Sequence, residues 1–277
     1  MSIIMLLDNG SLRATATLQL RRLAKELSNK VGKEIHPVSF NHSDRIPSKD
    51  IEGKPAQIFS QFMTKRLTQG ETEFILLPLF FGQSKTLSTY VPKEVRSLKE
   101  RFGDFELNIA KELYPLPNGE ARLTTIINEH ILKTCIENNH SFTNIVLVDH
   151  GSPLPQVTAV RQHLTQTVQN KLPEGVQLDQ AVMERREGKE FDFNGELLQN
   201  YLSQRAAAGE THATVILMFL LPGSHAGEDG DIIEICNSVM TNYPHFIIKI
   251  SPLISEHPEI ISILAEHLRA SDWVRLK

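Results

Sequence analysis

Three residues with metal-binding side chains each follow an apolar, strand-like run of this sequence. They are His150, Glu184 and His225, which come directly after residues 144–149, 178–183 and 213–224. Two neutral imidazoles and a carboxylate suit divalent iron, cobalt, nickel or zinc, with coordination positions left open. The same groups can accept protons, because imidazole titrates near neutral pH and burial can raise the pKa of a glutamate toward that range. A single histidine at a strand end usually only caps the strand, but three such residues indicate a site.

One reaction needs both properties of these side chains. When a divalent metal enters a tetrapyrrole, the ring must lose two pyrrole protons, so the site has to hold the metal and also accept protons. The opposite interpretation is a cluster that binds zinc adventitiously or binds nothing. Ligands of open parallel sheets bind outside the carboxyl ends of the strands, so the three residues are predicted to converge on one cleft.

The elements that must position these residues alternate along the chain between short apolar runs and amphipathic stretches. In the first half the predicted strands are 3–7, 35–40, 73–81 and 106–110, and the predicted helices are 14–30, 56–69, 92–101 and 121–136. In the second half the strands are 145–148, 178–183, 214–221 and 246–250, and the helices are 154–171, 193–208, 231–241 and 258–270. This order predicts an α/β protein with parallel sheets, helices on both faces and right-handed crossovers.

The two halves can also be aligned with each other. Three pairs of segments match in the same order and at nearly constant spacing: Leu7-Asp-Asn-Gly-Ser11 with Val148-Asp-His-Gly-Ser152, Pro115-Leu116 with Pro252-Leu253, and Asn128-Glu-His-Ile131 with Ala265-Glu-His-Leu268. Ordered matches of this kind indicate an internal duplication. We therefore predict two duplicated domains, residues 1–139 and 140–277, each with a four-stranded parallel sheet flanked by helices and joined by a polar linker at 137–141.

The duplication isolates the positions at which the halves differ. Opposite His150, Glu184 and His225, the first half carries Asn9, approximately Asn41, and Lys85. All three metal-competent residues are therefore in the second half, where we place the active site, and the first half lacks them. Aspartate precedes this position in both halves, as Asp8 and Asp149, so we interpret it as structural.

Composition excludes several function classes. The chain has 277 residues, of which 40% are hydrophobic and 22% charged, as is typical of a soluble globular protein. No apolar run approaches the roughly 18 residues of a membrane helix, and the amino terminus lacks the basic region of a signal peptide, so we expect a cytoplasmic protein without membrane binding. Cys135 and Cys236 form no C-x-x-C motif, and a net charge of −4 gives no basic surface for nucleic acid. The sequence contains no P-loop, no G-x-G-x-x-G and no nucleophile elbow.

Four segments resemble the successive motifs of the class II chelatases, the family of sirohydrochlorin cobaltochelatases and ferrochelatases. The segments are Val148-Asp-His-Gly-Ser152, Met183-Glu184, Phe219-Leu-Leu-Pro-Gly-Ser-His-Ala-Gly-Glu-Asp-Gly-Asp-Ile232 and Pro252-Leu-Ile-Ser-Glu-His-Pro258. The resemblance covers essentially the whole chain as two repeats. It implies a pair of chelatase-like α/β domains that face each other across a cleft, with sirohydrochlorin as the substrate.

The resemblance also implies roles for single residues. His150 and His225 would bind the metal and accept protons, and Glu184 would be the partnering carboxylate. The metal would be a substrate, Co²⁺ or Fe²⁺ with Ni²⁺ as a further candidate, and no other cofactor is expected. The product would enter sirohaem or cobalamin biosynthesis. A duplicated chain can bury within itself the face that a single-repeat relative buries as a homodimer, so we expect a monomer.

Sirohydrochlorin carries several carboxylates, so an acidic protein needs local positive charge around its cleft. The best candidates for binding those carboxylates follow Glu184 in the sequence and are Arg185, Arg186 and Lys189, with Lys85 of the first half as an addition. A solvated charged loop is an equally valid interpretation of each residue. Ser152 and the backbone amides of the next helix could hold an anionic group, or Ser152 could simply cap that helix.

Two features depart from the family pattern. Asp149 stands where the family usually has a small residue before the first histidine. The histidines lie in the second half, whereas two-repeat bacterial members carry them in the first, and the reversed placement resembles anaerobic cobaltochelatases and protoporphyrin ferrochelatases. A carrier that binds the metal or the tetrapyrrole without turnover is the alternative from another class, and a two-domain scaffold with an accidental cluster is a third.

Overall fold

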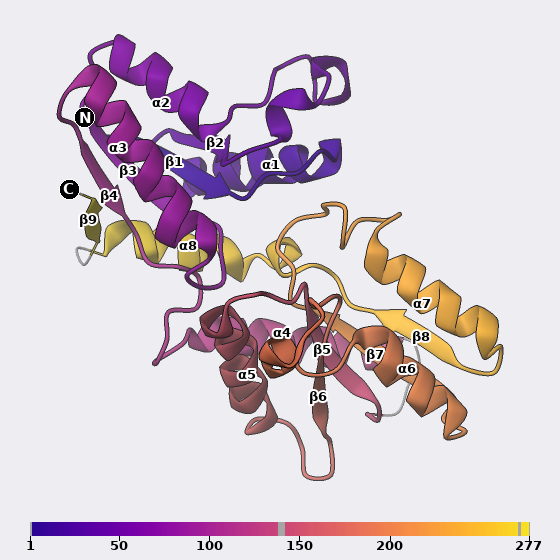
Figure 1. The fold of residues 1–277 in the computed structure, drawn as a ribbon. Helices are drawn as coiled ribbons and strands as arrows, with labels where there is room; N and C mark the ends of the chain where they lie inside the picture. The colour runs from indigo at the N-terminus through magenta and orange to yellow at the C-terminus, as the bar shows by residue number, and fades with distance from the viewer. Residues whose placement is uncertain (1, 138–141, 271–272, 277) are drawn as a thin grey trace. The chain divides into compact units, whose positions relative to one another are not determined.

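The computed structural model describes residues 2–137, 142–270 and 273–276. The chain forms two compact units, of which unit 1 comprises Met1–Pro115 with Pro258–Lys277, and unit 2 comprises Leu116–His257. Each unit is built on a mainly parallel sheet with helices on both faces, which confirms the predicted α/β class (Figure 1).

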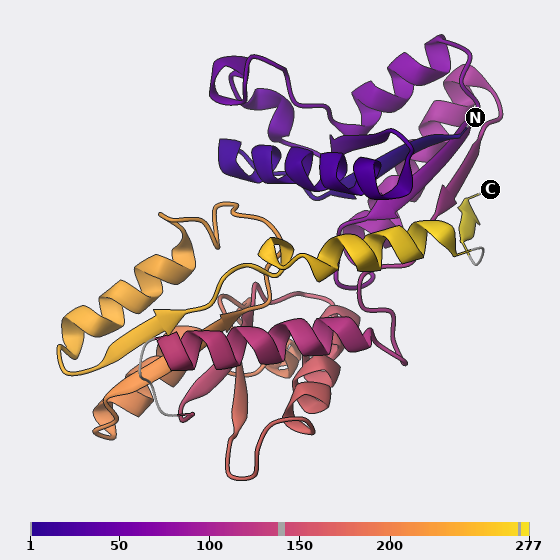
Figure 2. The ribbon, with the colours of Figure 1, turned by 180° about the vertical axis from the view of Figure 1, so that it is seen from behind.

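Unit 1 has a five-stranded sheet in the order β2-β1-β3-β4-β9. Its strands are β1 (Ile3–Asp8), β2 (Ile35–Ser39), β3 (Glu73–Pro78), β4 (Glu106–Ile109) and β9 (Val274–Leu276). Helices α1 (Ala14–Val31) and α8 (Glu259–Arg269) pack together on one face, and α2 (Phe59–Thr68) and α3 (Val91–Phe102) pack on the other (Figures 1 and 2). Strand β9 pairs antiparallel with β4 and is absent from the sequence-based prediction, because three residues at a sheet edge are too few to show a period.

Unit 2 has a four-stranded sheet in the order β6-β5-β7-β8, and all of its pairs are parallel. The strands are β5 (Ile145–Asp149), β6 (Leu178–Val182), β7 (His212–Leu217) and β8 (Ile247–Ile250). Helices α4 (Ala121–Glu137) and α5 (Pro155–Gln169) pack as one pair, and α6 (Leu198–Ala207) and α7 (Asp231–Asn242) as another. The first four strands of unit 1 follow the same order, β2-β1-β3-β4. In both sheets the strand order reverses direction between the first strand of the unit and the third, β1 and β3 or β5 and β7. In such sheets the ligand crevice lies at that reversal, which in unit 2 falls between β5 and β7.

The compact units divide the chain differently from the predicted domains. The predicted boundary between residues 139 and 140 falls outside the described residues, and the units change over at 115/116 and 257/258 instead. Helix α4, which would close the first repeat, packs on α5 and β7 of unit 2, and α8, which would close the second, packs on α1 and β3 of unit 1. Local periodicity predicts that a helix forms but not which sheet its apolar face covers.

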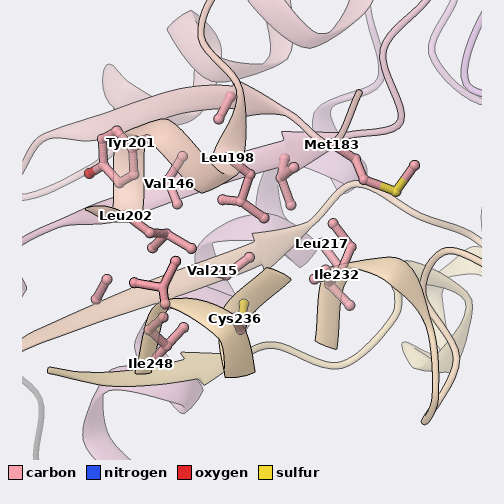
Figure 3. Close-up of a cluster of buried hydrophobic side chains, with 14 of the residues drawn as sticks. Val146, Met183, Leu198, Tyr201, Leu202, Val215, Leu217, Ile232, Cys236 and Ile248 are labelled. Carbon is pink, nitrogen blue, oxygen red and sulfur yellow. The ribbon is translucent and has the colours of Figure 1, made fainter. Parts of the chain in front are cut away.

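The core of unit 2 explains why its chemistry is restricted to one edge of the sheet. Val146 and Val215 on the strands contact Leu198 of α6 and Cys236 of α7 in a fully buried cluster (Figure 3). The opposite faces of β5 and β7 are covered by α4 and α5, so both faces of these strands are buried. The loops beyond the carboxyl ends of the strands are therefore where polar groups can gather around a ligand crevice. None of the helices in the described ranges is long and apolar enough to span a membrane.

Two predicted elements of unit 2 are shorter than expected. Strand β7 ends at Leu217 rather than residue 221, so His225 lies within the loop that leads to α7. Helix α6 begins at Leu198 rather than residue 193, and residues Lys189–Asn194 form a separate 3-10 helix. Both differences lengthen the loops at the carboxyl edge of the sheet.

Candidate active site

The backbone brings His150 and Glu184 together. They follow the adjacent strands β5 and β6, and the Glu184 amide donates a hydrogen bond to the His150 carbonyl at 3.1 Å. Gly151, at φ 90°, makes this approach possible, because a Cβ atom there would lie 2.0 Å from the Glu184 carbonyl oxygen. The glycine after His150 is therefore a geometric requirement of the close contact between these two loops.

The hydrogen bond made by His150 determines which of its nitrogens can act. Its Nδ1 lies 2.9 Å from the Gly151 carbonyl oxygen. A carbonyl oxygen only accepts, so Nδ1 carries the proton and Nε2 of the neutral ring has a free lone pair. That Nε2 lies 3.3 Å from Glu184 Oε1. Two acceptor atoms this close require a proton or a cation between them.

The spacing of this pair fits a divalent metal. A zinc-like ion lies about 2.0–2.2 Å from each nitrogen or oxygen ligand, so two ligand atoms at a tetrahedral angle are about 3.4 Å apart. The 3.3 Å between His150 Nε2 and Glu184 Oε1 is close to this value. Both side chains are well exposed, which leaves room for a substrate on the open side.

His225 joins the pair from the third loop. Its ring centroid lies 4.5 Å from that of His150, with the planes at 68°, so the two imidazoles meet edge to face. The structure thus brings His150, Glu184 and His225 to one edge of the sheet. In the described part of the chain, no group of three or more His, Cys, Asp or Glu side chains is arranged to hold a metal ion. Ligation by all three residues therefore stays a prediction.

Asp231, which contacts His225, was not predicted from the sequence as a residue of the site. His225 Nδ1 lies 2.5 Å from Asp231 Oδ2, at the first residue of α7. The signal was present in the sequence, since Asp231 belongs to the segment that resembles the third chelatase motif. Within that segment, the resemblance implied a role for the histidine alone.

A buried polar network holds the loop behind His150. Arg161 of α5 is 1% exposed, and it donates to the carbonyl oxygens of Ala181 at 2.9 Å and of Asn194. The Asn194 side chain in turn accepts from the Ser152 amide at 3.0 Å and donates to the Ser152 carbonyl at 2.9 Å. Arg161 and Asn194 were not predicted, because nothing local in the sequence indicates that an arginine on a helix is buried.

Ser152 forms a turn that leads into α5, but it is not the N-cap of that helix, because Leu154 holds the N-cap position and no side chain caps it. The Ser152 Oγ accepts the Leu154 amide at 3.1 Å, just before α5 begins. Ser11 makes the same bond with the Arg13 amide at 3.0 Å before α1. Because this bond also occurs in the half without the histidines, it serves the start of the helix. Anion binding by Ser152 stays a prediction.

Three of the candidate cations lie in different surroundings. Arg185 pairs with Asp192 at 3.3 Å and donates to the Gly195 carbonyl at 3.0 Å, so it braces its own loop. Arg186 lies over the Phe191 ring, 5.8 Å from its centroid. Lys85 of unit 1 lies over the Tyr90 ring, 5.4 Å from its centroid. These positions favour Arg186 over Arg185 as a group available to an anion.

Unit 1 repeats the backbone frame without the chemistry. Asn41 donates its amide to the Asn9 carbonyl at 3.2 Å, as Glu184 does to His150, and Gly10 makes the close approach. The Asn9 side chain accepts the Thr86 hydroxyl at 2.6 Å. An amide held by a hydroxyl offers neither a basic nitrogen nor a charge. The frame is therefore common to both units, and the imidazoles and carboxylate are specific to unit 2.

Comparisons with known proteins agree with this picture. The sequence model of the CbiX family matches residues 144–271. No curated protein sequence matches the chain. The match covers β5 to α8 and includes His150, Glu184 and His225.

Solved structures of chelatases share the fold of the whole chain. SirB from Bacillus subtilis, solved with Fe³⁺, is 14% identical with a TM-score of 0.66 over 97% of this chain and 95% of its own. SirB from Bacillus subtilis subspecies spizizenii, in complex with cobalt, is 13% identical with the same score over 97% and 94%. CbiX, described as the terminal enzyme of sirohaem biosynthesis in denitrifying bacteria, is 10% identical with a TM-score of 0.58 over 98% of both chains. The family match over residues 144–271 and the shared fold confirm the resemblance of the chain to class II chelatases.

Proposed function

We propose that the chain is a sirohydrochlorin chelatase that inserts a divalent metal, Co²⁺ or Fe²⁺, into its tetrapyrrole substrate. The observation that carries the proposal is the pair formed by His150 Nε2 and Glu184 Oε1 at 3.3 Å, with the His225 ring beside it. The CbiX family match over this part of the chain supports it. The metal is a substrate here, and the protein supplies ligands and bases.

The chemistry requires two proton acceptors per turnover. The free ring has two pyrrole N–H groups, and the metallated ring has none, so M²⁺ enters as two protons leave. His150 and His225 each offer a neutral nitrogen that can accept one of them. Glu184 would hold the incoming metal against His150 and balance its charge. Both imidazole side chains are exposed to solvent, so the protons can pass on to water.

Recognition of the macrocycle needs positive charge that the whole protein does not supply. The formal net charge is −4, so the field of the protein does not attract an anionic ring. In the loop that follows Glu184, Arg185 is paired with Asp192, whereas Arg186 lies over the Phe191 ring. We propose that Arg186 binds a substrate carboxylate and that Lys85 is a further candidate for this role.

The direct test is to mix the purified chain with sirohydrochlorin and excess Co²⁺, Fe²⁺ or Ni²⁺ under anaerobic conditions and follow the absorbance of the ring. A chelatase gives many metallated rings per chain, and the preferred metal gives the highest kcat/KM. A carrier gives at most one equivalent of spectral change. An insertion rate no higher than that of the protein-free mixture, for all three metals, would refute the proposal.

A further inference from the structure

The loop between β7 and α7 folds back tightly on itself. The Ile232 amide donates to the His225 carbonyl at 3.1 Å, and the Asp231 amide donates to the Ser224 carbonyl at 3.2 Å. Gly230 allows this closure, because a Cβ atom there would lie 2.7 Å from the His225 carbonyl oxygen. The backbone therefore fixes the first turn of α7 against His225.

This closure places one carboxylate on one ring nitrogen. Asp231 Oδ2 lies 2.5 Å from His225 Nδ1. Asp231 is the first residue of α7, where the helix dipole favours a negative charge. An ionised carboxylate only accepts, so the proton of the bond belongs to Nδ1. Nε2 is then the nitrogen of His225 that has a free lone pair.

His150 has the same tautomer, but a different hydrogen-bond partner fixes it. Its Nδ1 donates to the Gly151 carbonyl at 2.9 Å, so its Nε2 is also the free nitrogen. The two rings, whose centroids are 4.5 Å apart, therefore both have Nε2 as the free nitrogen. His150 is oriented by a neutral carbonyl, and His225 is oriented by the Asp231 carboxylate. Carboxylate bonds of this kind fix the ring orientation of metal-binding histidines and raise their basicity as ligands.

We propose that Asp231 is a positioning residue that holds His225 in the Nδ1–H tautomer and so keeps its Nε2 available to the metal. The tautomer follows from the hydrogen bond alone, whereas the part played by Nε2 rests on the proposed function. Asp231 contacts His225 and acts through it.

The first test reads the tautomer directly. The metal-free full chain, labelled with ¹⁵N-histidine, is studied by NMR at a pH where the imidazoles are neutral, and the His225 signals are assigned by their loss in His225→Ala. We expect a protonated Nδ1 in the parent protein. In Asp231→Ala the Nε2–H form should become the major tautomer. In Asp231→Asn, whose amide oxygen can still accept, the shift should be smaller. An unchanged Nδ1–H tautomer in Asp231→Ala would overturn the proposal.

The second test measures Co²⁺ binding by titration calorimetry. Loss of an orienting partner typically weakens metal affinity about 10–100-fold, and we expect that loss for Asp231→Ala and a smaller one for Asp231→Asn. Glu234→Gln is the matched control, since it removes an exposed carboxylate from the same first turn of α7 and should leave affinity within about twofold. Each variant must keep the thermal transition of the parent.

The two tests separate the failure of the positioning role from the failure of the proposed function. If His225→Ala weakens Co²⁺ binding and Asp231→Ala does not, the positioning role is wrong while the metal site stands. If His225→Ala itself leaves Co²⁺ affinity unchanged, the metal role of His225 in the proposed function is wrong, and the tautomer measurement still decides whether Asp231 sets the ring.

Discussion

Asp149 and Arg161 form a buried ion pair in unit 2, with Asp149 Oδ1 3.4 Å from Arg161 Nε. Unit 1 has the same aspartate as Asp8, but Leu20 stands at the position of the arginine, at the same distance along the chain. Leu20 is buried in the core, and Asp8 Oδ1 is buried without a hydrogen-bond partner. The buried aspartate is therefore paired with an arginine in unit 2 but not in unit 1. This difference has measurable consequences for stability.

The first consequence concerns Asp8. Burial raises its pKa from the ordinary value of 3.8 to about 6, so the fold favours the protonated carboxyl. Stability from this group is fully present below about pH 4 and is lost as the pH rises through 6. Asp8→Asn should therefore stabilise the protein at pH 8, by roughly 3 kcal/mol at most, with a gain that shrinks toward pH 4. Urea unfolding of variant and parent across this range measures the difference, and a gain independent of pH would contradict the prediction.

The second consequence concerns the ion pair itself. Removing one partner of a buried pair typically costs about 3–5 kcal/mol, because the other charge stays buried and unpaired. Arg161→Leu, which copies unit 1, should destabilise the protein by an amount of this order at pH 7. Burial already raises the pKa of Asp149, and the Arg161 guanidinium opposes that rise, so its loss should raise the Asp149 pKa further. Adding Asp149→Asn to Arg161→Leu should recover part of the loss in urea unfolding. No recovery would mean that Arg161 acts mainly through its bonds to Ala181 and Asn194.

The third prediction tests the asymmetry between the units. His150→Ala should lower turnover by orders of magnitude, since general-base action alone is typically worth about 10²–10⁴ and the metal also loses a ligand. Asn9→Ala is the matched control, because Asn9 occupies the same place in the backbone frame of unit 1 and should leave turnover within a few-fold. Initial rates of metal insertion measure both. If Asn9→Ala were as damaging as His150→Ala, the chemistry would not belong to unit 2 alone.

The fourth prediction separates the two arginines of the Glu184 loop. Arg186→Ala should raise KM for sirohydrochlorin with little change in kcat, because a group that holds the ring equally in ground and transition states contributes only to binding. Arg185→Ala should mainly loosen the loop, since Arg185 is held by Asp192 and the Gly195 carbonyl. Steady-state kinetics decides between these roles. Arg101→Ala, which removes an arginine lying over the Phe102 ring in unit 1, is a control for loss of charge. Equal KM values for Arg186→Ala and the parent would remove Arg186 from the site.

The sequence by itself determined the fold class and the convergence of the site. Apolar runs alternating with amphipathic stretches specify parallel strands joined by helices, and that pattern is local. Because parallel strands end at one edge, three polar residues at or beyond the ends of strands β5, β6 and β7 had to lie near one another. His150, Glu184 and His225 could be found for this reason, without knowledge of any contact.

Only the tertiary structure decided which partners those residues have. Asp231 lies six residues beyond His225, and only the tight backbone turn between them brings its carboxylate onto Nδ1. Arg161 is read from sequence as one polar residue of an amphipathic helix, yet packing buries it beneath the His150 loop. The exchange of α4 and α8 between the units likewise depends on which sheet offers an uncovered apolar face. Each of these outcomes depends on contacts between segments that come together only when the chain folds. No local sequence pattern encodes such contacts.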